Sequence, residues 1–162
     1  GQAMLHHFHG VPKREMPAKL FGVYRHRVTV PATPWLRGFS DTFLVPVSRW
    51  TETREADLPA GSGLRVLVAS DEIGPCLIED PANRALHMLN HLEYDSDTLL
   101  QEYLRDLEAG GPIRAPVNYF PKDDPKRAPR NRWRSHAHLF FGNWINQIYQ
   151  TSPFDLAAVG RG

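Results

Sequence analysis

The clearest pattern of apolar and polar positions predicts a helix over residues 95–109. Its apolar residues recur every three or four positions, which places them on one face of a helix with about 3.6 residues per turn. They are Leu99, Leu100, Tyr103, Leu104 and Leu107. Asp95 suits the N-cap of this helix, and Gly110 suits the position after its end, where a left-handed backbone is common.

Two further helices are predicted near the ends of the chain. Residues 1–9 form the first, and Gly10 followed closely by Pro12 ends it. Residues 135–149 form the second, and Pro153 stops it. The apolar face of this second helix consists of Phe140, Phe141, Trp144, Ile145 and Ile148.

Short apolar runs bounded by Gly, Pro, Asp and Asn predict strands. We expect them at residues 23–30, 42–47, 64–69, 75–79 and 84–89. A loop around Pro17 and an irregular segment at residues 111–134, rich in proline and charge, complete the pattern. Strands interspersed with helices favour an α/β layer fold, although five strands with few helices between them also suit an α+β arrangement. No internal repeat or long linker divides the chain into two domains.

Composition narrows the class of protein. Of the 162 residues 41% are hydrophobic, which suffices for a folded core, and the formal charge of +1 offers no bulk attraction to nucleic acid. No uncharged apolar run approaches the ~20 residues that cross a bilayer, so no membrane partner is expected. The single cysteine has no partner for an internal disulfide and fits a reducing compartment, which predicts a cytoplasmic protein.

His91 and Glu93 form the first candidate site, because they lie where the last predicted strand gives way to the helix at 95–109. Open α/β sheets carry their chemistry at such positions. In an extended backbone residues two apart point the same way, so the Glu93 carboxylate is able to orient the His91 imidazole for general-base catalysis. The pattern His-x-Glu is common, and on its own it also suits a surface pair or a buried structural histidine.

Three other groups of residues are weaker candidates. His6 and His9 share a helical face, but no cluster of Cys, Asp or Glu accompanies them, so we favour a solvated face and expect no metal. Cys76 lies in an apolar strand, where burial raises a thiol pKa, which favours a structural cysteine over a nucleophile. The basic segment 122–134 suits either a solvated loop or a phosphate-bearing ligand such as coenzyme A or a nucleic-acid backbone.

Several segments of the chain carry motifs in a fixed order. Residues 17–24 read Pro-Ala-Lys-Leu-x-Gly-Val-Tyr, residues 37–44 read Arg-Gly-Phe-Ser-Asp-x-Phe-Leu, and residues 91–95 read His-x-Glu-Tyr-Asp. The order continues through Asn118–Pro121, Trp133–His136, Asn143-Trp144 and Pro153–Leu156. Together these segments resemble the homoserine O-succinyltransferase family, whose members commit homoserine to methionine synthesis.

The resemblance implies a fold and a triad. The fold is similar to class I glutamine amidotransferases, a three-layer α/β sandwich of flavodoxin-like type with a nucleophile elbow, and the triad is Cys-His-Glu. His91 takes the position of the general base, and Glu93 that of the carboxylate which orients it. The resemblance also places Lys19, Ser48 and Arg105 in contact with the substrate. The guanidinium of Arg105 suits an α-carboxylate, and from the pattern alone it suits a helix-surface ion pair equally well.

The start of the chain bears on the missing member of the triad. The family's nucleophile lies in a Cys-Trp-Gly-Ala-Gln-Ala motif, and Gly1-Gln2-Ala3 corresponds to its last three residues. The chain also starts inside an expected helix, without an initiator Met or a capping residue. We therefore expect residues 1–162 to be the C-terminal portion of a single acyltransferase domain, with the catalytic cysteine three residues before Gly1 in a missing N-terminal portion.

The activity that the resemblance implies is a homoserine O-acyltransferase with a ping-pong mechanism. It would move a succinyl or acetyl group from acyl-CoA, a co-substrate, to the homoserine hydroxyl, with no bound cofactor and as a homodimer. The family's Gly-His-Pro-Glu reads Asn90-His91-Leu92-Glu93 here, which reshapes the pocket and makes serine a second candidate acceptor. The sequence also suits a glutaminase-type hydrolase on the same triad, or a non-catalytic binding module that uses segment 122–134.

Overall fold

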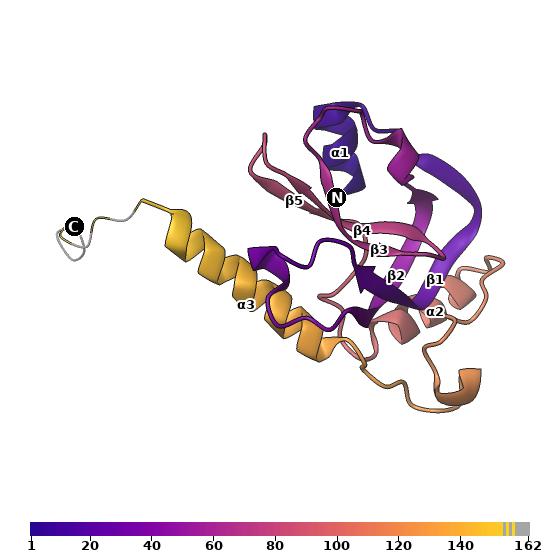
Figure 1. Cartoon of the computed structure of the whole chain (residues 1–162). Helices are drawn as coiled ribbons and strands as arrows, with labels where there is room; N and C mark the ends of the chain where they lie inside the picture. Colours follow the sequence, from indigo (N-terminus) through magenta and orange to yellow (C-terminus); the bar gives the residue numbers. More distant parts are fainter. Residues whose placement is uncertain (154, 156, 158–162) are drawn as a thin grey trace.

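Five strands form one sheet in the order β2-β1-β3-β4-β5 in the computed structural model, which describes residues 1–153, 155 and 157 (Figure 1). Every neighbouring pair in this order is antiparallel. The strands are β1 (Arg14–Val28), β2 (Thr42–Glu52), β3 (Arg65–Ser70), β4 (Gly74–Asp80) and β5 (Ala85–Met88). The helices are α1 (Gln2–His9), α2 (Thr98–Glu108) and α3 (Arg134–Thr151), with 3-10 turns η1 (Pro34–Leu36), η2 (Glu55–Asp57) and η3 (Pro121–Asp123).

β1 begins well before the predicted strand, because the expected loop around Pro17 is part of it. β1 pairs with β2 along most of its length, but the register shifts between Glu15 and Leu20. Pro17 lies in this irregular stretch, where its missing N–H breaks no hydrogen bond of the ladder. The prediction of a loop was therefore wrong, since the bulge accommodates the proline within the strand.

β2 is also longer than predicted, and it runs through Pro46 to Glu52. It lies at one end of the strand order, so one of its edges faces away from β1. The Pro46 carbonyl points to that edge and accepts a hydrogen bond from the backbone N–H of His91 at 2.9 Å. An edge strand tolerates proline in this way, and here the proline also ties β2 to the loop after β5.

The other predicted strands and the first helix appear within one or two residues of their expected bounds. Gly10 ends α1 with a φ of 66°, and Gly110 follows α2 with a φ of 72°, as the helix-stop pattern predicts. α2 begins at Thr98, with Asp97 at its N-cap. The expectation that Asp95 caps this helix was wrong, because turns at residues 92–93 and 96–97 keep the backbone non-helical until Thr98.

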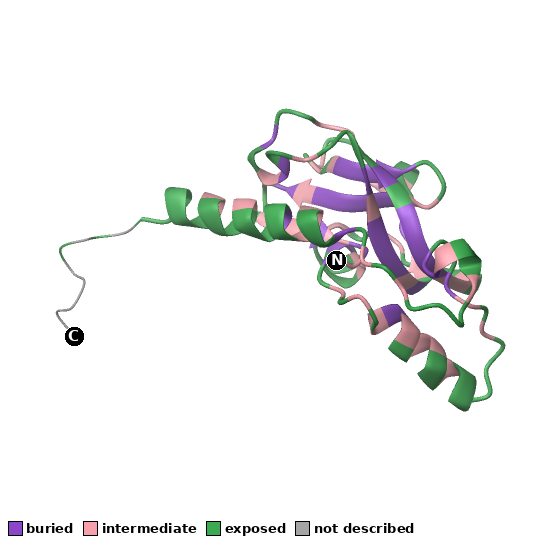
Figure 2. Ribbon diagram, turned by 90° about the horizontal axis from the view of Figure 1, so that it is seen from below, coloured by how far each residue is buried: buried purple, intermediate pink, exposed green. Residues whose placement is uncertain are grey.

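α3 forms as predicted, but only Phe140 of its expected apolar face enters the core. The other four members of that face, Phe141, Trp144, Ile145 and Ile148, are exposed. The amide of Asn143 fixes the helix to the turn at η1 through the carbonyls of Trp35 and Arg37, at 3.2 and 2.8 Å. Figure 2 shows that the rest of α3 extends past the sheet with mostly exposed residues.

The buried side chain of Trp133 connects the core to the loop that follows β5. Trp133 belongs to the main core cluster, which also contains residues of the sheet and of α2. Its indole N–H donates to the Tyr94 carbonyl at 2.8 Å, so the irregular segment 111–134 holds the loop in place from the other side. None of the helices in the described part of the chain has the length and apolarity to traverse a bilayer.

Candidate active site

The loop between β5 and α2 brings His91 and Glu93 into contact. The Nδ1–H of His91 donates to Oε1 of Glu93 at 2.7 Å, so the imidazole is held with Nε2 as the free ring nitrogen. Burial acts to raise the pKa of the Glu93 carboxyl, but the hydrogen bond from His91, a backbone hydrogen bond and the attraction of the His91 ring together lower that pKa below its ordinary value. Glu93 is therefore an ionised acceptor at neutral pH. The pairing occurs through a turn at residues 92–93 and not through an extended backbone as the sequence suggested.

Tyr94 covers one face of the His91 ring. The two ring centroids lie 4.2 Å apart with an interplanar angle of 17°, which is a stacked arrangement. The hydroxyl of the same tyrosine donates to Oε1 of Glu102 at 2.6 Å. Tyr94 thus contacts both the His91 imidazole and a carboxylate on α2.

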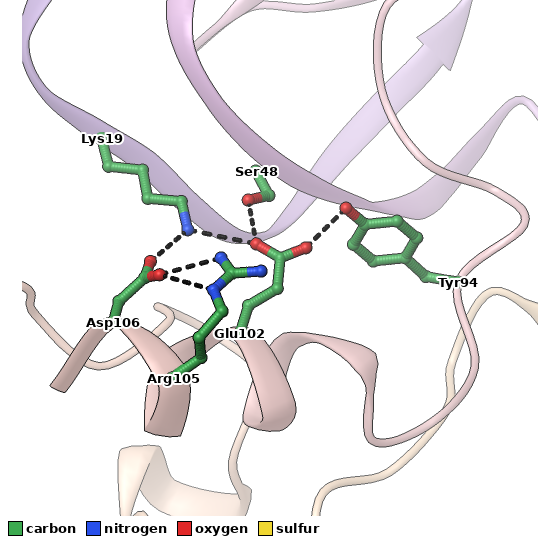
Figure 3. A network of polar contacts seen from close by, with 6 residues as sticks. All are labelled: Lys19, Ser48, Tyr94, Glu102, Arg105 and Asp106. Carbon is green, nitrogen blue, oxygen red and sulfur yellow. Dashed lines mark hydrogen bonds and ion pairs between the residues drawn. The ribbon is translucent and has the colours of Figure 1, made fainter. Parts of the chain in front are cut away.

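Glu102 is the centre of a polar cluster that joins three elements (Figure 3). Its Oε2 accepts hydrogen bonds from Lys19 Nζ of β1 at 3.1 Å and from the hydroxyl of Ser48 of β2. Burial acts to raise the pKa of the Glu102 carboxyl, but the hydrogen bonds from Ser48, Tyr94 and Lys19 lower it. The carboxylate is therefore ionised, and it brings Lys19 and Ser48 to one place although they come from different strands.

Arg105 lies one turn after Glu102 on the same face of α2. Its guanidinium donates to Oδ1 of Asp106 at 2.8 and 3.0 Å, and its side chain is 67% exposed. Asp106 in turn accepts from Lys19 at 2.7 Å, and the Lys19 side chain is only 5% exposed. Two cations and two carboxylates thus lie side by side in one network, an arrangement that can bind a zwitterion such as an α-amino acid by exchanging partners.

The structure therefore brings all five residues singled out from the sequence into one region, connected through Tyr94. It adds Tyr94 and Glu102, which the sequence analysis did not assign to the site. Glu102 lies one turn before Arg105 on α2. The spacing of these two residues, three apart on a helix, was the signal that could have placed both on one functional face.

Asn90 holds the loop from behind. Its side-chain amide donates to Nε2 of His26 at 2.9 Å, and the Nδ1–H of His26 donates to the Tyr24 carbonyl at 3.0 Å. Both side chains are buried. Burial lowers the pKa of His26 to about 4, so this histidine is neutral and able to accept the hydrogen bond.

Cys76 does not belong to the candidate site. It is buried within β4, and burial raises its pKa to about 12. A thiol in this state is protonated at neutral pH and enclosed by other side chains, so it is unsuited to nucleophilic attack. These features agree with the structural role expected from its apolar surroundings.

The histidines of α1 do not converge on a common point. His6 donates from Nδ1 to the Val11 carbonyl at 3.1 Å, and His9 contacts the buried carboxylate of Asp80 at 2.6 Å. No group of three or more His, Cys, Asp or Glu residues arranged for a metal ion occurs within residues 1–153, 155 and 157. The pattern is thus that of separate polar contacts.

Several cations of the basic segment 122–134 are exposed and contact neighbouring polar groups at the surface. Arg127 pairs with Asp124 at 3.5 Å, Arg132 donates to the Asn118 carbonyl, and Arg134 donates to the Ser96 hydroxyl at 2.9 Å. These contacts favour the solvated loop over a phosphate cradle. The last motif of the family resemblance is Pro153–Leu156. Two of its residues, Phe154 and Leu156, lie outside the described residues.

Solved structures with the same fold are glutamine amidotransferases. One from Thermotoga maritima superposes with a TM-score of 0.65 at 16% identity and covers 93% of this chain and 60% of its own. One from Methylobacillus flagellatus gives a TM-score of 0.57 at 14% identity, with 90% and 59% covered. These neighbours confirm the expected glutamine amidotransferase-like fold, and at such low identity they show the fold alone.

Relatives with much higher sequence identity are homoserine O-acetyltransferases. Homoserine O-acetyltransferase of Cereibacter sphaeroides is 61% identical over 161 residues, which are 99% of this chain and 53% of the relative. The enzyme of that name from Rhizorhabdus wittichii is 63% identical over 99% of this chain and 50% of its own length. The chain thus spans about half the length of these curated relatives. The family model described as homoserine O-succinyltransferase matches residues 1–154, and the chain therefore belongs to the homoserine O-succinyltransferase family.

Proposed function

We propose that the full-length protein containing this chain is a homoserine O-acyltransferase. The observation that carries the proposal is the joining of two features in one region: a His91–Glu93 pair at 2.7 Å and a cluster of alternating charges around Glu102. The His91–Glu93 pair suits general-base catalysis, and the charged cluster suits binding of an α-amino acid. The relatives are named as acetyltransferases, which favours acetyl as the acyl group, and the family is named for succinyl transfer, so both donors enter the test.

The nucleophile in this proposal is a cysteine upstream of Gly1. A Cβ at position 1 would clash with the Met88 carbonyl, so Gly1 packs directly against the end of β5, the strand that His91 follows shortly in the sequence. A cysteine three residues earlier would thus lie near the His91 loop and near the N-terminal end of α1, where a thiolate is favoured. Residues 1–162 are then the C-terminal portion of one catalytic domain.

The first half of the reaction forms an acyl-enzyme. The cysteine thiol gives its proton to Nε2 of His91, and its sulfur attacks the carbonyl carbon of the acyl-CoA thioester. The bond between that carbon and the CoA sulfur breaks. The CoA thiolate then takes the proton from His91 and leaves as the free thiol, so acyl-CoA is consumed as a co-substrate.

The second half transfers the acyl group to homoserine. Nε2 of His91 takes the proton of the homoserine hydroxyl, and the oxygen attacks the acyl-enzyme carbon. The bond between carbon and the cysteine sulfur breaks, which yields the O-acyl ester and restores the cysteine thiol with the proton from His91. Glu93 keeps the Nδ1–H in place and stabilises the imidazolium that forms in each half.

The polar cluster holds the amino acid in this proposal. Arg105 releases Asp106 and binds the α-carboxylate through its planar guanidinium. The ionised carboxylate of Glu102 accepts hydrogen bonds from the α-ammonium group. It already accepts such bonds from Lys19 and Ser48. Lys19 and Ser48 then fix the Glu102 carboxylate and contact the bound substrate.

Release of CoA tests the proposal. Full-length protein is mixed with acetyl-CoA or succinyl-CoA and homoserine, and the free thiol is measured over time. Release that depends on homoserine and falls by about 100-fold or more in His91→Ala supports the proposal. Release with serine alone would assign serine as the acceptor, and ammonia release from glutamine without acyl-CoA would assign the hydrolase. No acceptor-dependent release with either donor contradicts an acyltransferase.

Three further tests address the oligomeric state that we propose, an alternative function and the cellular location that we propose. Sedimentation equilibrium of the full-length protein checks the homodimer, and a mass equal to one chain contradicts it. Salt-sensitive binding to RNA that disappears when the lysines and arginines of segment 122–134 are neutralised would instead support a binding module. Cell fractionation checks the cytoplasmic location.

A further inference from the structure

Tyr94 connects the two halves of the candidate site. Its ring stacks on the His91 imidazole at 4.2 Å, and its hydroxyl donates to Glu102 at 2.6 Å. Its backbone carbonyl accepts the indole N–H of the buried Trp133 at 2.8 Å. The tyrosine is therefore fixed at its ring face, at its tip and at its backbone.

The stack supplies a constraint that Glu93 alone does not give. The hydrogen bond from Nδ1 of His91 to Glu93 fixes the direction of one N–H, but it leaves the ring free to tilt about that direction. A second ring at stacking distance fixes the plane of the imidazole. Together the two contacts determine where Nε2 points, and a general base needs that direction to reach its proton.

The hydroxyl supplies a different constraint. Glu102 accepts three hydrogen bonds, from Lys19, Ser48 and Tyr94, and only the bond from Tyr94 comes from the loop that carries His91. The position of the Glu102 carboxylate is therefore linked to the position of the His91 ring through one side chain. Removal of the hydroxyl alone and removal of the ring should consequently have different effects.

We propose that Tyr94 is a positioning residue that sets the plane of the His91 imidazole through its ring and the place of the Glu102 carboxylate through its hydroxyl. The proposal rests on the proposed acyl transfer for its kinetic consequences, but its first half concerns only the histidine ring. The aromatic ring serves the proton-transfer step, and the hydroxyl serves binding of the amino acid.

Two substitutions in the full-length protein separate these roles. Tyr94→Phe keeps the stack and removes the hydroxyl, so the KM for homoserine should rise about tenfold while kcat stays within about twofold, as expected for one lost hydrogen bond to a charged group. Tyr94→Leu removes both, so kcat should also fall by about tenfold or more. Tyr119→Phe is the control, because it removes the hydroxyl of a buried tyrosine that is hydrogen-bonded to the backbone of Ser96 and Leu100 and not to His91 or Glu102.

A measurement without substrate separates the test of the role of Tyr94 from the test of acyl transfer. The ¹⁵N chemical shifts of the His91 ring report its tautomer and its surroundings. We expect them to change in Tyr94→Leu and to stay near those of the unsubstituted protein in Tyr94→Phe and Tyr119→Phe. If the unsubstituted protein transfers no acyl group, the proposed function fails and the shifts alone decide the role of the ring.

Either of two results would overturn the inference. The first is a folded Tyr94→Leu variant whose His91 shifts match those of the unsubstituted protein. The second is a Tyr119→Phe variant that changes KM, kcat or the His91 shifts as much as the Tyr94 variants do, since the effects would then reflect general loosening of the loop.

Discussion

Asn90 donates a hydrogen bond from its side-chain amide to Nε2 of His26 at 2.9 Å, directly behind the loop that carries His91. Glycine occupies this position in the family motif that the chain resembles, and a glycine has no side chain to make this bond. The neighbouring departure, Leu92 in place of proline, is buried in the main core. Asn90 and Leu92 thus hold the loop through side-chain contacts, where the family motif restricts the backbone with glycine and proline.

The substitution Asn90→Ala should therefore loosen the loop. It leaves Nε2 of His26 buried without a donor, so the free energy of unfolding should fall by about 1–2 kcal/mol. We also expect a lower kcat for acyl transfer with little change in the KM for homoserine, because His91 is the next residue. Urea unfolding and steady-state kinetics of the full-length variant measure both quantities. Thr53→Val is the control, since it removes a buried hydroxyl that has no hydrogen-bond partner among the residues the structure describes, and equal losses in both variants would contradict the role of Asn90.

His26 should make the protein less stable in mild acid. Its pKa is about 4 in the folded protein, because burial lowers it from 6.5. Between these two pH values the unfolded chain binds a proton that the folded protein does not, so stability falls as the pH falls. The loss from this group is about 3 kcal/mol between pH 6.5 and pH 4. Urea unfolding at several pH values should show that the free energy of unfolding depends less steeply on pH in His26→Gln. An unchanged slope would refute the low pKa of His26 as the cause.

Asp80 should stabilise the fold at neutral pH through a second buried cluster. Its carboxylate accepts hydrogen bonds from His9 at 2.6 Å, from the Asn83 amide at 2.8 Å and from His87 at 3.3 Å. Burial opposes the charge, but these hydrogen bonds together lower the pKa of the carboxyl below its ordinary value of 3.8. The stabilisation is therefore present above about pH 4 and is lost as the pH falls further.

The substitution Asp80→Ala tests this cluster. It leaves two histidines and an amide without their acceptor, so the free energy of unfolding at pH 7 should fall by about 3 kcal/mol. Asp71→Asn is the matched control, because the Asp71 side chain is 80% exposed and pairs with Arg27 on the surface. That change should cost less than about 1 kcal/mol. Thermal and urea unfolding compare the two variants, and similar losses would count against a special role for Asp80.

The periodic segments of the fold were predictable because their signal is local. The apolar spacing within residues 95–109 and the glycines that follow the first two helices are enough to define those helices. The region around Pro17 was not predictable, because a proline normally excludes a strand and only the bulge opposite β2 makes room for it. The exposure of most of the apolar face of α3 was also not predictable, since periodicity shows that a helix has an apolar face but not what lies against it.

The candidate site also has one part that the sequence predicted and one part that it did not. His91 and Glu93 are two residues apart, so the sequence alone suggested their contact. The cluster around Glu102 depends on Lys19 and Ser48, which lie 83 and 54 residues away in the sequence. No local pattern relates such residues, and only the resemblance to a family placed them together. Tyr94 was within a recognised motif, but its double contact required the three-dimensional arrangement.

Glu93 should matter for the rate of the reaction more than for the fold. Its hydrogen bond with His91 lowers the pKa of the Glu93 carboxyl against the effect of burial, so the group is ionised above pH 4.5, its ordinary pKa. Glu93→Gln keeps the shape but removes the charge that stabilises the imidazolium and holds its tautomer. We expect kcat for CoA release to fall by about 100-fold or more, with a much smaller change in the KM for homoserine.

The control for this prediction is Asp95→Asn, which neutralises an exposed carboxylate two residues further along the same loop. A general effect of charge on the loop would lower kcat in both variants alike. An orienting role predicts a large loss only in Glu93→Gln, and it also predicts that the ¹⁵N shifts of the His91 ring change in that variant alone. Equal kcat values in Glu93→Gln and the unsubstituted protein would remove Glu93 from the mechanism and leave His91 to act without a carboxylate partner.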